Sequence, residues 1–286
     1  MNFRGGLFHR IVILLIFAAS FRNNLYTAII VKLTYIFHSG FLLETGHCLL
    51  VFDHWIDRAK VMPKALASQK PMYVFSSHFH DDHFNPRILA WKEQKPNITY
   101  LLSKDILRHR RAQNDAADVW LAKGSTWQDE HLKVWATGSN DSGVSWIVEV
   151  EGKRIFHAGD LNNWYARFLT DDYQGGTIIS KEFGEIDPLK DEKQYLGELK
   201  DIRKITDHFD LVMFPVDGRI GNGYTRGGRQ FLERFTVGLF VPMHFVASGF
   251  ESAWRMKEFC DEKQVRFWSI GYDGETLDLD EESISN

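Results

Sequence analysis

Three histidines and two aspartates fall within six consecutive residues of this chain. They stand in the pattern His-Phe-His-Asp-Asp-His, which begins at residue 78 and follows directly on an apolar run. Neutral imidazole and carboxylate are the groups that hold Zn²⁺ and related ions in proteins. In an extended segment the side chains of His78 and His80 share one face, so they can bind one ion together. Asp82 and His83 follow after a turn, and we expect them to reach a second ion beside the first.

The pattern resembles the signature of the metallo-β-lactamase superfamily of metal-dependent hydrolases. Other segments resemble pieces of that superfamily in the same order along the chain. They are the opening hairpin at 35–42 and 49–53, a strand that ends in Gly159-Asp160, and a final strand at 241–243 that is followed by His244. The resemblance extends over roughly residues 31 to 270, and within the superfamily it is closest to the branch that contains the ascorbate-phosphate lactonases.

The resemblance implies an α+β fold, a four-layer αββα sandwich in which two packed sheets are flanked by helices. It also implies a ligand set for two ions at one edge of the sheets. His78 and His80 would hold the first ion, Asp82, His83 and His244 would hold the second, and Asp160 would bridge the two.

One connection departs from the superfamily's pattern. Where the superfamily has a histidine that completes the first metal site, residues 137–143 read Thr-Gly-Ser-Asn-Asp-Ser-Gly and contain none. Asp141 is the best substitute, because a carboxylate can replace an imidazole in the ligand shell, and a water is the alternative. More oxygen ligands would shift the preference of the site from zinc toward manganese or iron.

Several further residues are expected to support the metal centre. By the resemblance, Asp53 lies beneath the metal loop and accepts hydrogen bonds from it. His38 either lines the site or satisfies a turn. Asp82, already a candidate ligand, is also a candidate catalytic group. His157 and a metal-bound water are candidates for the acid that protonates the leaving group.

Residues on two later segments are candidates for substrate binding. Asn162 and Trp164 follow the bridging aspartate and suit the lining of a pocket, although Trp164 equally suits packing at the start of a helix. Residues 218–229 contain five glycines and three arginines, which predicts a flexible cationic loop. That loop is either a surface turn or a site that meets an anion, and Arg219 is the favoured contact because it is nearest the preceding strand.

Together these residues predict a metal-dependent hydrolase that uses a metal-activated water on a small anionic ester, lactone or phosphoester. The expected cofactors are two divalent ions, zinc or else manganese or iron. Two alternatives stay open: a lipid phosphodiesterase of the same fold, and a non-catalytic metal-binding or sensing protein, which the missing histidine would explain.

The composition fits one domain with a sizeable core, since 44% of the 286 residues are hydrophobic. The net charge of -4 gives no global basic field, so no nucleic-acid partner is expected. The two cysteines, Cys48 and Cys260, lie far apart in the chain. This favours free thiols in a reducing compartment, and we therefore expect a cytoplasmic protein.

The chain divides into three parts. Residues 1–27 form an apolar extension in which basic residues precede the apolar run 11–19. This extension resembles a weak secretory signal, and a short anchor or a segment outside the domain are the alternatives. Any export or membrane contact depends on it. The hydrolase domain is expected at 28–276, followed by an acidic tail at 277–286 that we expect to fray.

Local patterns predict short strands separated by turns, with helices between the later strands. The strands are expected at 31–37, 41–45, 48–53, 72–77, 98–102, 132–136, 144–150, 154–160, 211–216, 239–243 and 265–270. Helices are expected at 63–69, 85–94, 103–111, 181–204 and 251–262.

The position of the extension generates a prediction. Because every candidate ligand and every expected strand lies after residue 30, a chain that starts near Ala28 should fold and keep the catalytic rate of the full chain. Circular dichroism and turnover of a model ester compare the two proteins. Loss of soluble, active protein would show that the apolar segment packs into the domain.

Overall fold

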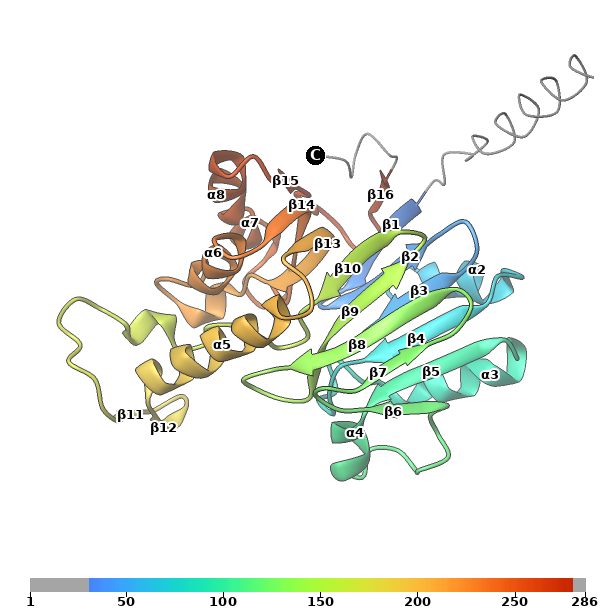
Figure 1. Cartoon of the computed structure of the whole chain (residues 1–286), viewed down its shortest axis with the longest axis horizontal. Coiled ribbons are helices and arrows are strands. Elements are labelled where there is room, and N and C mark those ends of the chain that lie inside the picture. Colours follow the sequence, from blue (N-terminus) through green and yellow to red (C-terminus); the bar gives the residue numbers. More distant parts are fainter. Residues whose placement is uncertain (1–30, 280–286) are drawn as a thin grey trace, which may run out of the picture.

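The computed structural model describes residues 31–279 of the chain (Figure 1). The extension at 1–27, its interpretation as a signal or anchor, and the tail beyond residue 279 lie outside the described residues. None of the helices within 31–279 has the length and apolar character needed to cross a bilayer.

The first sheet combines an antiparallel meander with a parallel half. Its strand order is β16 (Thr276–Leu279), β1 (Val31–Phe37), β2 (Gly40–Glu44), β3 (Leu49–Phe52), β4 (Met72–Ser76), β5 (Ile98–Ser103) and β6 (Val119–Leu121). Strands β16 to β3 pair antiparallel, and β3 to β6 pair parallel. The meander forms because short runs of aromatic and β-branched residues are separated by tight turns.

The second sheet repeats this division. Its order is β15 (Arg266–Phe267), β14 (Thr236–Met243), β13 (His208–Pro215), β10 (Lys153–His157), β9 (Val144–Val150), β8 (Leu132–Gly138) and β7 (Thr126–Gln128). Strands β7 to β10 pair antiparallel, and β10, β13, β14 and β15 pair parallel. A two-stranded hairpin, β11 (Ile178–Ser180) with β12 (Gly184–Ile186), stands apart from both sheets.

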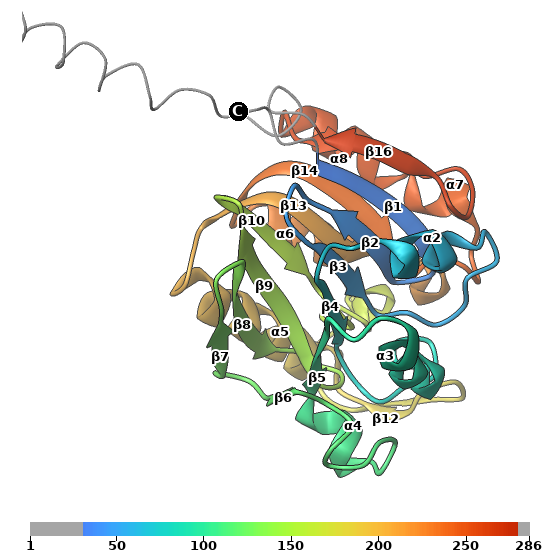
Figure 2. The ribbon, with the colours of Figure 1, turned by 90° about the vertical axis from the view of Figure 1, so that its right-hand side faces the viewer.

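Helices cover the outer face of each sheet (Figures 1 and 2). On the first sheet these are α2 (Val61–Ala67), the 3-10 turn η1 (Pro86–Ala90), α3 (Trp91–Gln94) and α4 (Lys104–Arg108). On the second they are α5 (Pro188–Arg203), α6 (Arg226–Leu232), α7 (Phe250–Ala253) and α8 (Met256–Glu262). The predicted four-layer αββα sandwich is confirmed.

The main core fills the space between the sheets. Phe75 of β4 and Trp146 of β9 meet there with ring centroids 5.5 Å apart, and Phe52 stacks on Phe75 at 4.9 Å. A second cluster joins the outer face of the first sheet to its helices, through residues such as Val74 and Met62. Strands β3 and β4 are therefore buried on both faces, as their unbroken apolar sequences indicate.

Some boundaries differ from the prediction. Strand β10 ends at His157, so Asp160 lies in the following loop. The expected helix at 181–204 begins only at Pro188, where the Asp187 carboxylate accepts a hydrogen bond from the Lys190 amide, and the preceding residues form the β11–β12 hairpin. The first sheet continues through Leu279, past the expected domain boundary at 276, because β16 pairs with β1.

The glycine-rich segment at 218–229 is largely ordered structure. It forms the 3-10 turn η3 (Gly218–Ile220) and the first residues of α6. Asp217 stabilises η3, since its carboxylate accepts a hydrogen bond from the Arg219 amide at 2.9 Å. The segment is therefore a capped turn followed by the start of a helix, whereas the sequence had predicted a flexible loop.

Candidate metal centre

The candidate ligands meet where parallel strands end. Strands β4, β10, β13 and β14 each deliver a loop at their carboxyl end, and ligands of α/β proteins commonly bind at such edges. Four such loops and the β1–β2 turn supply the polar residues of this edge: 78–83, Asp160, Asp217, His244 and His38.

These residues form two groups of potential ligand atoms. His78, His80 and Asp160 offer atoms that all lie within 4.8 Å of one another. A second group meets the same limit and consists of His38, Asp82, His83 and His244. Most of these side chains are buried, so their grouping differs from that of acids and histidines on an open surface.

Asp160 lies between the two groups. Its Oδ2 is 3.2 Å from Nε2 of His78. Its Oδ1 is 3.0 Å from Nε2 of His83 and 3.4 Å from Nε2 of His244. One carboxylate thus faces imidazoles of both groups, one oxygen to each, which is the position of a bridging ligand.

The donor atoms fit a metal ion. Nε2 of His38, His78 and His83 and Oδ1 of Asp160 are buried and lack a hydrogen bond of suitable geometry. A buried polar atom without a partner costs about 1–3 kcal/mol, and four at one point are unusual. Divalent cations would satisfy all four atoms together, and imidazole with carboxylate is the donor chemistry that zinc, manganese and iron accept.

Hydrogen bonds at the opposite ring nitrogens aim the imidazoles inward. Nδ1 of His83 lies 2.7 Å from the Asp53 carboxylate. Nδ1 of His244 lies 2.9 Å from the Asp217 carboxylate. Such contacts fix the tautomer and the orientation of a metal-binding histidine, leaving Nε2 free for the ion.

Asp53 has the position that the resemblance implied. Its Oδ1 accepts the backbone N–H of Ser77 at 2.7 Å, and its Oδ2 accepts the Ser77 hydroxyl at 2.6 Å. Burial opposes its charge, but His157 and His83 together keep the pKa of Asp53 below its usual value. The carboxylate therefore stays ionised and holds the start of the metal loop.

The charges of the site also favour a cation. Burial works against an ionised Asp160, yet the surrounding imidazoles, His83 first, hold the pKa of Asp160 well below its usual range. Burial opposes protonation of His83 as well, but Asp160 and Asp53 raise the pKa of His83 well above its usual value. A metal ion would replace that proton as the positive charge between the carboxylates.

His38, in the β1–β2 turn, directs its ring toward the other candidate ligands. Its Nε2 is 3.2 Å from Oδ2 of Asp82, and its ring centroid is 4.1 Å from that of His244. Burial lowers the pKa of His38 to about 4, so the imidazole is neutral at pH 7 and its lone pair is available to an ion. The structure thus adds His38 to the second group of potential ligands.

Strained turns bring His38 and His244 together. Both residues, like Asp53, adopt positive φ angles: 57° for His38, 64° for His244 and 40° for Asp53. The amide of His244 donates to the carbonyl of His38 at 3.1 Å and so joins the edges of the two sheets. Non-glycine residues in this conformation are uncommon, and they concentrate at functional sites.

Asp141 belongs to neither group of potential ligands. Its side chain lines the adjoining cavity, and desolvation there, followed by the Asp160 charge, raises the pKa of Asp141. The first group therefore consists of three residues, His78, His80 and Asp160. Three protein ligands with an open position are typical of catalytic metal sites.

His157 and Asn162 do not face the cavity. The His157 ring is fully buried, its Nε2 lies 2.9 Å from the Ser39 carbonyl, and it stacks on Phe52 at 5.2 Å. The structure therefore excludes it as the leaving-group acid. The Asn162 side chain is also buried, packed against Gly227 of α6. Both positions read as site residues because they flank Asp160, but their side chains support the loop.

A cavity of about 270 Å³ opens over the ligand groups. Trp164, Tyr165, Phe183 and Ile220 form an apolar part of its wall. Trp164 is fixed beside the centre, since its indole N–H donates to the Asp160 carbonyl at 2.8 Å and its ring lies 5.3 Å from His244. The polar part of the wall includes Asp82, Asp141, Asp160, Glu182, Asp217, Arg219 and His244.

Arg219 lines this cavity, but its guanidinium already has a partner. Its Nε donates to Oδ2 of Asp217 at 2.8 Å, and a second N–H of the same fork also contacts that carboxylate. Asp217 in turn orients His244. Arg219 thus supports a candidate ligand, and its remaining N–H groups are available to a substrate.

Sequence comparison with known proteins agrees with a metal centre at this edge of the sheets. Residues 32–167 match the family model described as "Beta-lactamase superfamily domain". A UPF0173 metal-dependent hydrolase of Desulforamulus reducens is 25% identical over 75% of this chain and 84% of its own length.

The chain has the metallo-β-lactamase fold, and its residues 32–167 are similar to the domain of that superfamily.

Two further comparisons agree with this assignment. A UPF0173 metal-dependent hydrolase of Natranaerobius thermophilus is 29% identical over 45% of this chain, and the match spans only 60% of that relative. The solved structure of Igni18, a metallo hydrolase of Ignicoccus hospitalis, has a TM-score of 0.58 at 16% identity and covers 87% of this chain and 98% of its own. At that identity the likeness shows the metallo-β-lactamase fold alone.

Two features of this candidate metal centre were absent from the sequence-based prediction. Asp217, which orients His244, follows a buried strand in the same way as Asp53, and that shared position could have indicated its role. Glu182 and Phe183 line the cavity from the β11–β12 hairpin. No pattern in the sequence indicated this position, because these residues are far from the ligands in the chain and only the tertiary fold brings them close.

The connection that lacks the superfamily's histidine generates a prediction. Gly143 has a φ of +64°, and a Cβ there would lie 2.0 Å from the Ser77 carbonyl oxygen and 2.6 Å from Cβ of His78. Gly143→Ala should displace His78 and weaken metal binding by about tenfold or more, because ligand geometry must hold within fractions of an ångström.

Gly152→Ala is the matched control. Gly152 also has a positive φ, +76°, but nothing lies within 4 Å of its Cβ position. Both variants should lose roughly 1–2 kcal/mol of stability from the backbone conformation, and only Gly143→Ala should also lose metal affinity in a competitive chelator titration. Equal metal affinities would show that the close approach of Gly143 does not position His78.

Proposed function

We propose that this protein is a metal-dependent hydrolase that acts on a small anionic ester, lactone or phosphoester. The observation that supports it most is the position of Asp160, one carboxylate shared by two groups of buried, unpartnered ligand atoms at the floor of a cavity. A purely structural site is closed by its ligands and needs no adjoining cavity, so the geometry favours catalysis over metal storage or sensing.

Two divalent ions are the proposed cofactors, with zinc first and manganese or iron as alternatives. His78, His80 and Asp160 would hold one ion. Asp82, His83, His244 and His38, together with the second oxygen of Asp160, would hold the other. When bound, such ions supply an activated water and polarise the scissile bond.

The chain's own residues then organise the reaction. Asp82 is part-exposed at the cavity, and although burial opposes its charge, the contact with His38 keeps the pKa of Asp82 below its usual value. Its ionised carboxylate can bind a metal ion and accept a hydrogen bond from the attacking water. Trp164, Tyr165 and Phe183 exclude bulk water from one side of the cavity.

The apolar wall favours one variant of this proposal. Phe183 of the hairpin lines the cavity and remains 39% exposed, and Ile179 on the same hairpin is 78% exposed. A substrate with an acyl or aromatic group beside its anionic centre would cover these side chains. A lipid phosphodiesterase is therefore the second candidate function.

The setting of the enzyme is also part of the proposal. The partner is a small anionic substrate, with no nucleic acid. Cys48 and Cys260 are buried free thiols, which supports the expected reducing, cytoplasmic compartment.

The ligand assignment predicts that His80→Ala or Asp160→Ala abolishes hydrolysis while the domain stays folded. The reason is that these changes remove the support of the metals, whereas the core between the sheets is untouched. Metal content by elemental analysis, thermal unfolding and turnover of phosphodiester and lactone model substrates are measured together. His131→Ala is the control, because His131 belongs to neither group of potential ligands. Full activity without any transition metal would contradict the proposal.

Arg219 supplies a separate prediction about the substrate. A guanidinium bond to phosphate or carboxylate is worth roughly 1.5–3 kcal/mol, so Arg219→Ala should lower kcat/KM for anionic esters by about 10- to 150-fold. Neutral esters should lose less, and only through the weakened Asp217–His244 support. Arg219→Lys should recover part of the loss, since lysine lacks the planar fork. An unchanged ratio of anionic to neutral turnover would refute a contact between Arg219 and the substrate's charge.

A further inference from the structure

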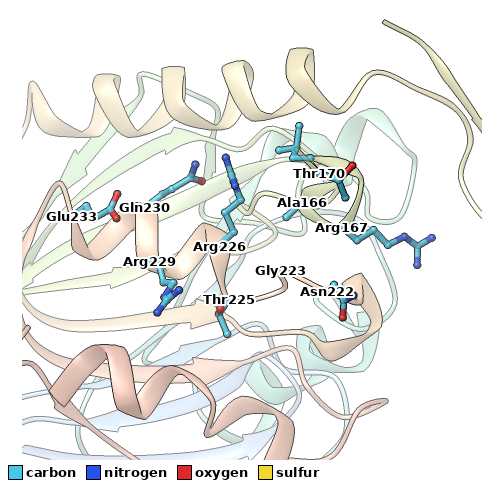
Figure 3. A pocket seen from close by; sticks show the side chains of 11 residues that line it. Ala166, Arg167, Thr170, Asn222, Gly223, Thr225, Arg226, Arg229, Gln230 and Glu233 are labelled. Carbon is cyan, nitrogen blue, oxygen red and sulfur yellow. The ribbon is translucent and has the colours of Figure 1, made fainter. Parts of the chain in front are cut away.

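A second cavity, of about 500 Å³, lies beside the metal cavity. Its wall comes from the segment around η2 (Ala166–Phe168) and from residues 222–233, which include all of α6. Figure 3 shows Ala166, Arg167 and Thr170 on one side and the α6 residues on the other. No residue of this wall belongs to either group of metal ligands.

Basic side chains outnumber acidic ones in the wall of this cavity, although the protein as a whole is acidic. Three arginines, Arg167, Arg226 and Arg229, line it against one carboxylate, Glu233, on a chain whose net charge is -4. Two of them also pair with glutamates outside the lining, Arg167 with Glu182 and Arg226 with Glu192. The two cavities also contrast, because four aspartates line the metal cavity. A concave wall of one sign raises the local concentration of ligands of the other sign.

The arginines keep N–H groups available. Arg226 uses its Nε to bind Glu192 at 2.8 Å, and Arg167 uses one terminal nitrogen to bind Glu182 at 2.6 Å. Arg229 makes no ion pair within residues 31–279, and its guanidinium lies 4.6 Å from the ring centroid of Phe259. Because a guanidinium has five N–H donors, each of the three can still bind an anion.

Neutral hydrogen-bonding groups complete the wall. Asn222 and Gln230 contribute amides, and Thr170 and Thr225 contribute hydroxyls. The Thr170 hydroxyl donates to Asp172, but its oxygen can still accept a bond. Such groups suit the hydroxyls of a polar small molecule that surround its charged end.

We propose that this cavity is a binding site for a phosphate-bearing small molecule, separate from the hydrolytic centre. A phosphate can accept the N–H groups that Arg167 and Arg226 do not give to Glu182 and Glu192, together with those of Arg229. Its three terminal oxygens can each accept several bonds, which suits guanidinium groups arriving from two walls. A single carboxylate has half the charge and fewer acceptor sites.

Arg167 is shared between this site and the metal cavity. Its partner Glu182 lines the metal cavity, and its guanidinium also lies 4.8 Å from the ring centroid of Phe183. Its Cδ lies 3.3 Å from the position of a Cβ on Gly221, so the side chain packs closely against that turn. A phosphate in the second cavity thus competes with Glu182 for the residue that holds the hairpin over the metals.

The experiment is a titration of inorganic phosphate at constant ionic strength, followed by calorimetry. Arg226→Gln and Arg229→Gln should each weaken phosphate binding by about tenfold or more, because each removes a charge-assisted donor. Glu233→Gln should tighten it, since this change removes the carboxylate of the wall. Arg203→Gln, the same substitution at an exposed position of α5, is the matched control and should leave the affinity unchanged.

The series is repeated in the His80→Ala background, because phosphate also binds metal ions. The proposed site should persist there with the same dependence on Arg226, Arg229 and Glu233. Thermal unfolding of each variant shows whether it is folded. The proposal is overturned if both arginine variants match Arg203→Gln, or if His80→Ala alone removes all phosphate binding.

Discussion

The centre depends on one electrostatic constraint, a fully ionised carboxylate buried among imidazoles. Asp160 is 5% exposed, and its oxygens face His78 on one side and His83 and His244 on the other. Burying such a charge is costly unless it is paired and hydrogen-bonded. Since Asp53 and Asp217 already hold the opposite nitrogens of two of these histidines, the imidazoles are oriented toward Asp160, and positive charge is required at the point where they meet.

The backbone meets this requirement by accepting strain. His38, Asp53 and His244 occupy the left-handed region that β-sheet residues avoid, and each such conformation costs of order 1–3 kcal/mol. The hydrogen bond from the His244 backbone N–H to the His38 carbonyl carries the constraint from one sheet to the other. The packed core between the sheets, with Trp146 and Phe75 in contact, makes the two edges a rigid frame. Residues that begin in distant parts of the chain are thereby held within ligand distance.

The elements that depend on local sequence patterns could be predicted. The strands from residue 31 to 53 and the loop at 78–83 follow from apolar runs that end in polar residues, whereas the roles of Asp53 and Asp160 were implied by the resemblance to the superfamily. The prediction was incomplete where tertiary contacts decide. His38 joins the second ligand group only because the first sheet meets β14, and the β11–β12 hairpin reaches the cavity only through Arg167 and Tyr165. The opposite error occurred at His157 and Asn162, where nearness to Asp160 in sequence was taken as nearness to the cavity.

The hairpin shows why charge and apolar surface must be considered together at this site. Its residue Glu182 adds a further carboxylate to a cavity that already contains Asp82, Asp141, Asp160 and Asp217. Bound cations would offset only part of that charge, so an anionic substrate still needs a local donor. Arg219 is the cation of the cavity wall within the described residues, and Asp217 already binds part of its guanidinium group.

The apolar surface of Trp164, Tyr165 and Phe183 is then important, because it can bind the uncharged part of a substrate without adding repulsion. If the proposed function holds, selectivity in this centre depends on the hairpin as much as on the metal ligands.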